Sequence, residues 1–163
     1  MVSYLCDEML RKLARWLRIA GYDVISPVGL TDRELYRISV SNMRVLLTRD
    51  RDLSNMKGIE SLLIISDDLV TQLREVFDSY PVKDNPPGKS RCPACNGDLV
   101  SIRKADLSRE DEELIPPGVL EKQSIFLICS GCSKVYWYGK HWEKITSILG
   151  EYGLIPEDFD IPP

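Results

Sequence analysis

Short apolar runs separated by segments of helical spacing fill the first eighty residues of the chain. Four of these runs are rich in Val, Leu and Ile and hold few polar residues: "VSYLC" (2–6), "DVIS" (23–26), "RVLLT" (44–48) and "SLLII" (61–65). A short run that is apolar on both faces is typical of a strand that is covered on both sides. The pattern therefore predicts four buried strands.

A helical pattern follows the first of these strands. In residues 9–21 apolar side chains recur every three or four positions, and they are Leu10, Leu13, Ala14 and Leu17. Gly21 comes next, and glycine is suited to the left-handed backbone conformation in which many helices end. We therefore expect one amphipathic helix between the first and second strands.

Two further helices are predicted between and after the remaining strands. Residues 31–39 begin with Thr31 and Glu34 at the spacing of a capping box, in which side chains satisfy the first free amides of a helix. Residues 66–80 have helical spacing, and Ser66 is the expected cap. Alternation of buried strands and helices predicts an α/β domain built on a parallel sheet.

The composition changes at residues 81–90, "PVKDNPPGKS", whose three prolines neither continue a helix nor join a central strand. We expect an α/β domain over 1–80, a linker over 81–90, and a small β-rich domain over 91–145 whose terminal helix reaches about residue 150. Within this small domain, short apolar runs predict hairpins, and the acidic run at 109–113 predicts a solvated loop. The acidic, proline-containing tail at 151–163 is expected to be loosely ordered.

Overall composition limits the class of protein. The chain has 163 residues, 44% of them apolar, and a formal net charge of −4. The negative charge argues against a protein that coats nucleic acid without specificity, because such binding depends on Lys and Arg. No apolar run is long enough to cross a bilayer, and the amino terminus lacks the residue order of a signal peptide. We expect a cytoplasmic protein.

Four of the five cysteines form two Cys-x-x-Cys pairs, Cys92 with Cys95 and Cys129 with Cys132, separated by 33 residues. Two such turns can place four thiolates around one ion, which is the closed tetrahedral site of structural zinc. A segment of this size has too small a core to fold well alone, so a metal would supply stability. A redox dithiol pair and an iron–sulfur site remain open. Cys6, in the first predicted strand, is expected to act as a small apolar residue.

Carboxylates follow the predicted strands closely. Asp7 and Glu8 come directly after the first strand, Asp50 and Asp52 come after the third, and Asp32 lies in the first turn of the second helix. Carboxyl ends of parallel strands meet at one edge of a sheet, where functional groups gather. Several carboxylates in one place repel one another unless a cation lies among them. The pattern therefore predicts a Mg²⁺ or Mn²⁺ site, which could activate water for phosphodiester hydrolysis.

Each of these acids also has a structural interpretation, because Asp is common at helix starts as a cap. Because these acids converge on one edge of the predicted sheet, we favour the functional interpretation. Basic residues lie beside them: three arginines recur at i, i+4 and i+7 along the first helix, and two more flank Asp50. A polyanionic substrate would need such a surface. The candidate RNA contacts are Arg11, Arg15, Arg18, Arg49 and Arg51.

These motifs together resemble a known family. "LCDEMLRKLARWLRIAGYDV", "TDREL", "RVLLTRDRDL", "IPPGVL" and "CSGCSKVYWYGKHW" are similar to the PIN-like RNase family named after the carboxy-terminal domain of the Mut-seven exonuclease. The resemblance covers roughly residues 3 to 145. It implies a PIN-like domain with an attached zinc ribbon, a metal-dependent ribonuclease activity, and acidic site residues at Asp7, Asp32, Asp50 and Asp52. Arg11 and Ser133 stand where this family commonly has glycine.

Aromatic residues and one histidine lie near the second cysteine pair. Tyr136, Trp137, Tyr138 and Trp142 include candidates for stacking on RNA bases, and Trp142 is the one we select. Alternation along this segment means that at least two of the four pack inside the protein. His141 is the only histidine, and because four cysteines complete the metal site we expect it to have a structural role.

The leading hypothesis is a Mg²⁺- or Mn²⁺-dependent endoribonuclease. Asp7, Asp32 and Asp50 would hold the ion, and Asp52 or Glu8 would act as an outer ligand or proton acceptor. The zinc ribbon would help to select an RNA such as tRNA, rRNA or the ribosome. One alternative is an inactive or weakly active module that binds RNA or the ribosome. Another is a toxin-like nuclease controlled by a protein partner. Whether the chain forms a homodimer stays open.

Overall fold

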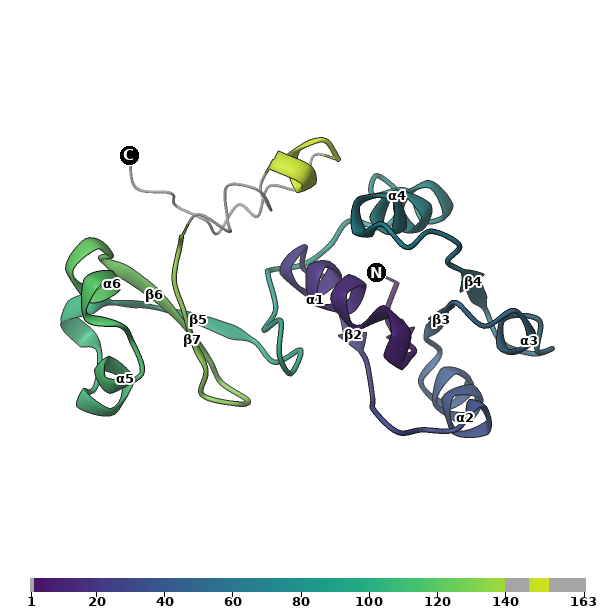
Figure 1. Ribbon diagram of the computed structural model, residues 1–163, viewed down its shortest axis with the longest axis horizontal. Coiled ribbons are helices and arrows are strands. Elements are labelled where there is room, and N and C mark those ends of the chain that lie inside the picture. The colour runs from purple at the N-terminus through teal and green to yellow at the C-terminus, as the bar shows by residue number, and fades with distance from the viewer. Residues whose placement is uncertain (1, 140–146, 153–163) are drawn as a thin grey trace.

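The computed structural model describes residues 2–139 and 147–152. Strands and helices alternate along the first half of the chain (Figure 1). In order they are β1 (Tyr4–Cys6), the 3-10 helix η1 (Glu8–Leu10), α1 (Arg11–Ile19), β2 (Val24–Ile25), α2 (Asp32–Asn42), β3 (Val45–Thr48), α3 (Arg51–Ser54), β4 (Ser61–Leu63) and α4 (Leu69–Ser79). All four predicted strands are present, so the predicted α/β fold class is confirmed.

The four strands form one parallel sheet in the order β2-β1-β3-β4. Tyr4 on β1 pairs with Val24 on one side and with Val45 on the other. Leu47 on β3 pairs with Leu62 on β4. Because every strand runs the same way, the segments that leave the carboxyl ends of the strands all emerge at one edge of the sheet.

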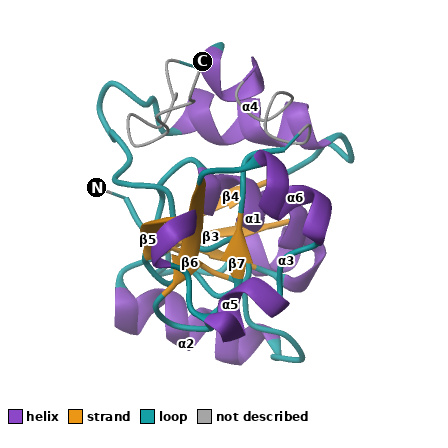
Figure 2. Cartoon of the chain, turned by 90° about the vertical axis from the view of Figure 1, so that its left-hand side faces the viewer, coloured by secondary structure: helices purple, strands orange, loops and turns teal. Residues whose placement is uncertain are grey.

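Helices cover both faces of this sheet (Figure 2). Successive side chains of a strand point to opposite faces, so Tyr4 and Cys6 enter one core while Leu5 enters the other. The larger core lies under α1 and α4, and the smaller one under α2 and α3. Cys6 is fully buried in the larger core, in agreement with its expected apolar role.

Local sequence signals explain where the helices begin and end. The predicted capping box is present at the start of α2, where the Glu34 carboxylate accepts hydrogen bonds from the N–H and hydroxyl of Thr31 at 2.8 and 2.7 Å. Gly21 has a φ of 96°, as predicted for the residue that follows α1. The cap of α4 is Asp68, which accepts from the Thr71 N–H, and not Ser66. The prediction for that cap was wrong by two residues.

The second part of the chain contains a three-stranded antiparallel sheet in the order β5-β6-β7. Its elements are β5 (Leu99–Arg103), the 3-10 helix η2 (Lys104–Asp106), α5 (Arg109–Glu113), α6 (Pro117–Lys122), β6 (Ile125–Cys129) and β7 (Val135–Tyr136). The acidic run is therefore the short helix α5 and not a loop, because the Ser108 hydroxyl accepts the Asp111 N–H and caps its first turn. Its surface is solvated, as expected.

The two parts are joined by contacts along the proline-rich segment. Gly88 donates its N–H to the Gly21 carbonyl at 3.1 Å, and the Tyr22 hydroxyl donates to the Asn85 carbonyl at 3.0 Å. Residues 147–152 return to the α/β core, where Ile148 and Leu149 are buried under the larger cluster. The end of the predicted terminal helix therefore belongs to the α/β domain, and it lies near α4 in Figure 1. Of the predicted tail at 151–163, Tyr152 packs against Phe77 and Glu151 pairs with Arg74, so these two residues are ordered by α4; residues 153–163 lie outside the described part of the chain.

Candidate functional site

Three carboxylates follow strands at the carboxyl edge of the parallel sheet. Asp7 comes directly after β1, Asp50 after β3, and Asp67 in the segment after β4. Parallel pairing of β1 with β3 and of β3 with β4 places these positions along one edge. This edge is where open α/β sheets carry their functional groups.

Asp7 is held rigidly at this edge. Its side chain caps η1, where Oδ1 accepts from the N–H groups of Met9 at 2.9 Å and Leu10 at 3.2 Å. Oδ2 accepts from the Arg49 N–H at 3.1 Å and from the hydroxyl of Thr48. Only 7% of the Asp7 surface is exposed. Four donors therefore fix the orientation of the Asp7 side chain and tie it to the β3–α3 segment.

Asp50 occupies the equivalent place after β3. Its Oδ1 caps α3 by accepting from the N–H groups of Asp52 at 2.7 Å and Leu53 at 3.0 Å. Its own N–H donates to the Thr48 hydroxyl oxygen at 3.0 Å. Among the described residues, no donor contacts Oδ2 of Asp50, and the residue is exposed. One oxygen of Asp50 is thus open to a ligand from solvent.

Thr48 links these two acids, although the sequence reading did not select it. Its hydroxyl donates to Asp7 Oδ2 and accepts from the Asp50 N–H, and the side chain is fully buried. A sequence signal existed, because Thr48 is the one polar residue at the end of the apolar run "RVLLT". Asp7 and Asp50 are therefore joined through one hydroxyl.

The remaining predicted acids lie further out. Asp32 is the exposed first residue of α2, and Asp52 is exposed in the first turn of α3. Glu8 accepts the Gly29 N–H at 3.3 Å, which ties η1 to the loop before α2. Within residues 2–139 and 147–152, these carboxylates do not form a cluster of three or more with their oxygens close together. The structure links the Asp7 carboxylate to the backbone N–H of Asp50 through Thr48, and it leaves Asp32 and Asp52 exposed on α2 and α3.

Asp67 is a further acid at this edge that the sequence reading missed. It forms an ion pair with the guanidinium of Arg49. The signal was available, since "SDD" follows the strand "SLLII" in the same way that Asp50 follows "RVLLT". Arg49 thus pairs with Asp67 through its side chain and contacts Asp7 through its N–H, while Arg51 is exposed.

The basic stripe predicted on α1 is divided by the structure. Arg11 and Arg15 are exposed, as a phosphate contact requires. Arg18 is only 7% exposed, and its guanidinium donates to the carbonyl oxygens of Val24 and Pro93 at 2.8 and 2.9 Å. The prediction of Arg18 as an RNA contact is therefore corrected. The spacing put it on the right stripe, but the end of α1 meets the first cysteine turn instead of solvent.

The four cysteines come together as their spacing predicted. The Sγ atoms of Cys92, Cys95, Cys129 and Cys132 all lie within 4.8 Å of one another. The Cys92–Cys132 and Cys95–Cys129 sulfur distances are 3.7 and 3.4 Å. Zinc–sulfur bonds of about 2.3 Å in a tetrahedron require sulfur atoms roughly 3.8 Å apart. The donor set therefore fits a metal such as zinc, and it leaves no position open for catalysis.

Backbone geometry makes the two cysteine turns equivalent. The N–H of Asn96 donates to the Cys92 carbonyl, and the N–H of Ser133 donates to the Cys129 carbonyl, both at 2.9 Å. Asn96 and Ser133 have φ values of 69° and 56°, so each adopts the left-handed conformation after the second cysteine of its pair. Asn and Ser tolerate this conformation better than β-branched residues do. The two turns therefore present their cysteines with the same backbone geometry.

Protonation of the cysteines reflects their crowding. Burial raises the pKa of Cys92, but the Tyr136 hydroxyl and two backbone N–H groups outweigh this and lower it to about 6. Burial and neighbouring thiols raise the pKa values of Cys95 and Cys129. Four adjacent thiols cannot all ionise without a counter-charge. A bound cation supplies that charge, so binding is expected to release protons.

Tyr136 is the aromatic residue whose role the structure defines. Its hydroxyl lies 3.1 Å from Cys92 Sγ, so it contacts a candidate metal ligand and faces the interior of the ribbon. Trp137 and Tyr138 are partly buried. His141 and Trp142 lie outside the described residues, so the predictions for both remain predictions.

Comparison with known proteins identifies one family. The family model described as the Mut7-C RNAse domain matches residues 2–149, which include both the carboxyl edge and the cysteine cluster. No curated protein and no solved structure matches the chain. Over the described residues, no helix has the length and apolar character needed to cross a membrane.

Proposed function

The chain belongs to the Mut7-C RNAse domain family, and we propose that it is an endoribonuclease that uses a divalent ion, Mg²⁺ or Mn²⁺, at the carboxyl edge of its parallel sheet. Membership of this family supports a ribonuclease activity. The observation that carries the site is the connection of the Asp7 carboxylate to the backbone N–H of Asp50 through the buried Thr48 hydroxyl. Two acids held in register by a third residue form a fixed structure, unlike acids that merely share a surface.

Carboxylate oxygens of these acids are suitable ligands for a hard cation. Asp50 has an exposed oxygen that no donor among the described residues contacts, and four donors hold the Asp7 side chain in one orientation. Mg²⁺ and Mn²⁺ prefer such oxygens and bind through one or a few carboxylates with water completing the shell. The exposed carboxylates of Asp32 and Asp52 are proposed to complete the set of acids around the ion. A bound ion would supply an acidic water and offset charge on the scissile phosphate.

RNA would approach this edge along basic residues. Arg11 and Arg15 on α1 are exposed, and Arg51 is exposed beside Asp50. Arg49 is paired with Asp67 and could exchange that partner for a phosphate when RNA binds. The role of these residues is to position the backbone of the substrate, which carries no sequence information by itself. Base selection would fall to the ribbon, including Trp142.

Cleavage of labelled RNA by the purified, zinc-loaded chain tests the proposal. A panel with single-stranded RNA, a hairpin, tRNA and rRNA is incubated with Mn²⁺, Mg²⁺ or chelator. We expect metal-dependent cleavage that falls at least about a hundredfold in Asp7→Asn and in Asp50→Asn, since even outer-shell changes at metal sites cost tenfold to a hundredfold. Asp78→Asn, which changes an exposed acid on α4, is the matched control and should cleave normally. Equal cleavage by parent and both edge variants would refute the assigned site.

One observation favours a second candidate, an RNA-binding module without useful turnover. Within the described residues the edge acids do not gather into a cluster of three. Binding of the same RNA panel, measured with and without Mn²⁺, separates the two functions. Binding without turnover under every metal condition would support the module, whereas metal-dependent turnover supports the nuclease.

A further inference from the structure

The edge strand β2 is closed by side chains instead of another strand. Val24 lies opposite Tyr4 of β1, but the backbone hydrogen bonds to Tyr4 are made by the residues beside Val24, such as the Asp23 carbonyl. The N–H and carbonyl of Val24 itself therefore point away from β1. The N–H donates to Asn96 Oδ1 at 3.0 Å, and the carbonyl accepts from Arg18 Nε at 2.8 Å. An edge strand normally leaves such groups to solvent or to another chain. Here both outward groups of Val24 are satisfied from within the molecule.

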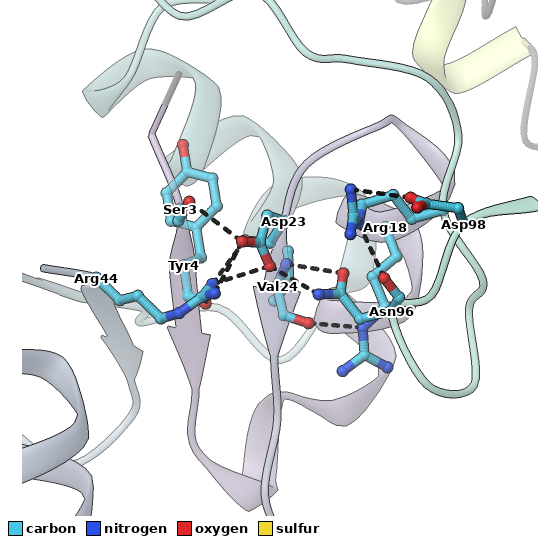
Figure 3. A network of polar contacts seen from close by, with 9 residues as sticks. Ser3, Tyr4, Arg18, Asp23, Val24, Arg44, Asn96 and Asp98 are labelled. Carbon is cyan, nitrogen blue, oxygen red and sulfur yellow. Dashed lines mark hydrogen bonds and ion pairs between the residues drawn. The ribbon is translucent and has the colours of Figure 1, made fainter. Parts of the chain in front are cut away.

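Asn96 comes from the first cysteine turn. Besides accepting from Val24, it donates through Nδ2 to Asp23 Oδ1 at 2.7 Å (Figure 3). Asp23 is held in turn by Arg44, whose guanidinium donates to both carboxylate oxygens at 3.0 and 2.8 Å. Arg44 directly precedes β3. One amide side chain thus connects the cysteine turn to the edge of the sheet and, through an ion pair, to its centre.

Arg18, on α1, forms hydrogen bonds to the same turn. Its NH1 group donates to the carbonyls of Pro93 and Ala94 at 2.9 and 3.3 Å, and these are the two residues between the paired cysteines. Its own carbonyl accepts the Arg91 N–H at 2.8 Å. Because Arg18 also bonds the Val24 carbonyl, one buried guanidinium joins helix, strand and cysteine turn.

The second cysteine turn shows that this use of Asn96 is not needed to make the turn. Ser133 holds the equivalent position, with the same backbone hydrogen bond and a left-handed φ, yet its side chain is exposed. Among the described residues, no side-chain hydrogen bond joins Ser133 to the α/β domain, so the turn accepts a small polar residue that does not dock there. The side chain of Asn96 is used for docking and not for the turn itself.

We propose that metal binding at the cysteine cluster controls the order of β2, so that the first cysteine turn is a metal-dependent brace of the α/β domain. Without an ion, the four sulfur atoms are no longer held around one point, and the turn loses the constraint that presents Asn96 and the two carbonyls. The Val24 N–H then loses its Asn96 acceptor, and Arg18, which holds the Val24 carbonyl, loses its two acceptors in the turn, so the short edge strand β2 opens more often. This linkage goes beyond the proposed ribonuclease function and does not depend on it.

Amide hydrogen exchange resolved by NMR on the full chain tests the brace. The zinc-loaded protein is compared with the same protein after removal of zinc by a chelator, with zinc content measured by mass spectrometry. We expect exchange of the Val24 amide to accelerate at least about tenfold on zinc removal, as loss of a buried hydrogen bond allows. Leu73 and Val76 in α4 are the internal references and should change less. Acceleration confined to residues 91–138 would overturn the proposal.

Two matched variants separate the brace from general instability of the ribbon. Asn96→Gly keeps the left-handed backbone but deletes the docking side chain, and we expect fast Val24 exchange whether or not zinc is bound. Ser133→Gly makes the same change in the second turn and should respond to zinc as the parent does. If Asn96→Gly keeps the response of the parent, the inference fails. Arg18→Met alters no residue of either turn but removes the donor to the Val24 carbonyl and to the two carbonyls of the first turn, and in it too the effect of zinc on Val24 should shrink to less than about threefold.

Discussion

Replacing Thr48 by valine tests the claim that one hydroxyl holds the two edge acids in place. Valine keeps the shape of threonine and its place in the core, but it removes the donor to Asp7 Oδ2 and the acceptor of the Asp50 N–H. Thr48 is fully buried, so water cannot replace the lost contacts without disturbing the strand. The change therefore acts mainly through two hydrogen bonds.

The expected cost follows from the chemistry of those bonds. A hydrogen bond to a charged group contributes about 1.5–3 kcal/mol, and an unsatisfied N–H adds about 1 kcal/mol. Three donors to the Asp7 carboxylate remain, which limits the loss. We expect Thr48→Val to lower the free energy of unfolding by about 3 kcal/mol. Thr48→Ser keeps the hydroxyl and deletes one buried methyl, so it should cost only about 1 kcal/mol.

Urea unfolding at neutral pH with zinc present measures both variants. A fall in the midpoint without a change in slope reports lost stability and not an altered unfolded state. Combining each variant with Asp7→Asn gives a double-mutant cycle, in which Thr48 and Asp7 should couple by at least about 1 kcal/mol. If valine and serine cost the same, or if the coupling is near zero, the hydroxyl does not position Asp7.

Three further changes test other parts of the structure. Burial raises the pKa of Asp23, but hydrogen bonds and the charge of Arg44 outweigh it and hold that pKa below its ordinary value. The Asp23–Arg44 pair therefore stabilises the fold above about pH 4, and its contribution is lost as pH falls through the lowered pKa of folded Asp23. In urea titrations, Asp23→Asn should lower the free energy of unfolding by about 1–2 kcal/mol at pH 7 and by progressively less below pH 4. Gly21→Ala should destabilise the protein by more than about 2 kcal/mol in the same assay, because an added Cβ would lie 2.0 Å from the Gly88 carbonyl oxygen and φ is positive; a loss below 1 kcal/mol would contradict the close approach. Cys95→Ser should abolish binding of one zinc per chain by native mass spectrometry, and full retention of the ion would show that the four sulfurs are not its ligands.

Several features could be predicted from the sequence because they depend on neighbours along the chain. Strand runs, the Thr31–Glu34 capping box and the left-handed Gly21 were placed correctly. Local geometry decides these features, since a cap or a left-handed residue acts within four positions. The paired spacing of the cysteines likewise predicted their cluster.

Only the tertiary structure decided which polar side chains are shared between elements. Arg18 belongs by spacing to an exposed stripe, yet it is buried because the first cysteine turn docks on that end of α1. Asn96 had no signal that distinguished it from Ser133, although one contacts the sheet and the other faces solvent. The sequence showed Thr48 only as the last residue of a strand, and its contact with Asp7 depends on the parallel pairing of β1 with β3. Helical and strand periodicity specify which face a residue occupies, but the partner that covers this face comes from a distant part of the chain.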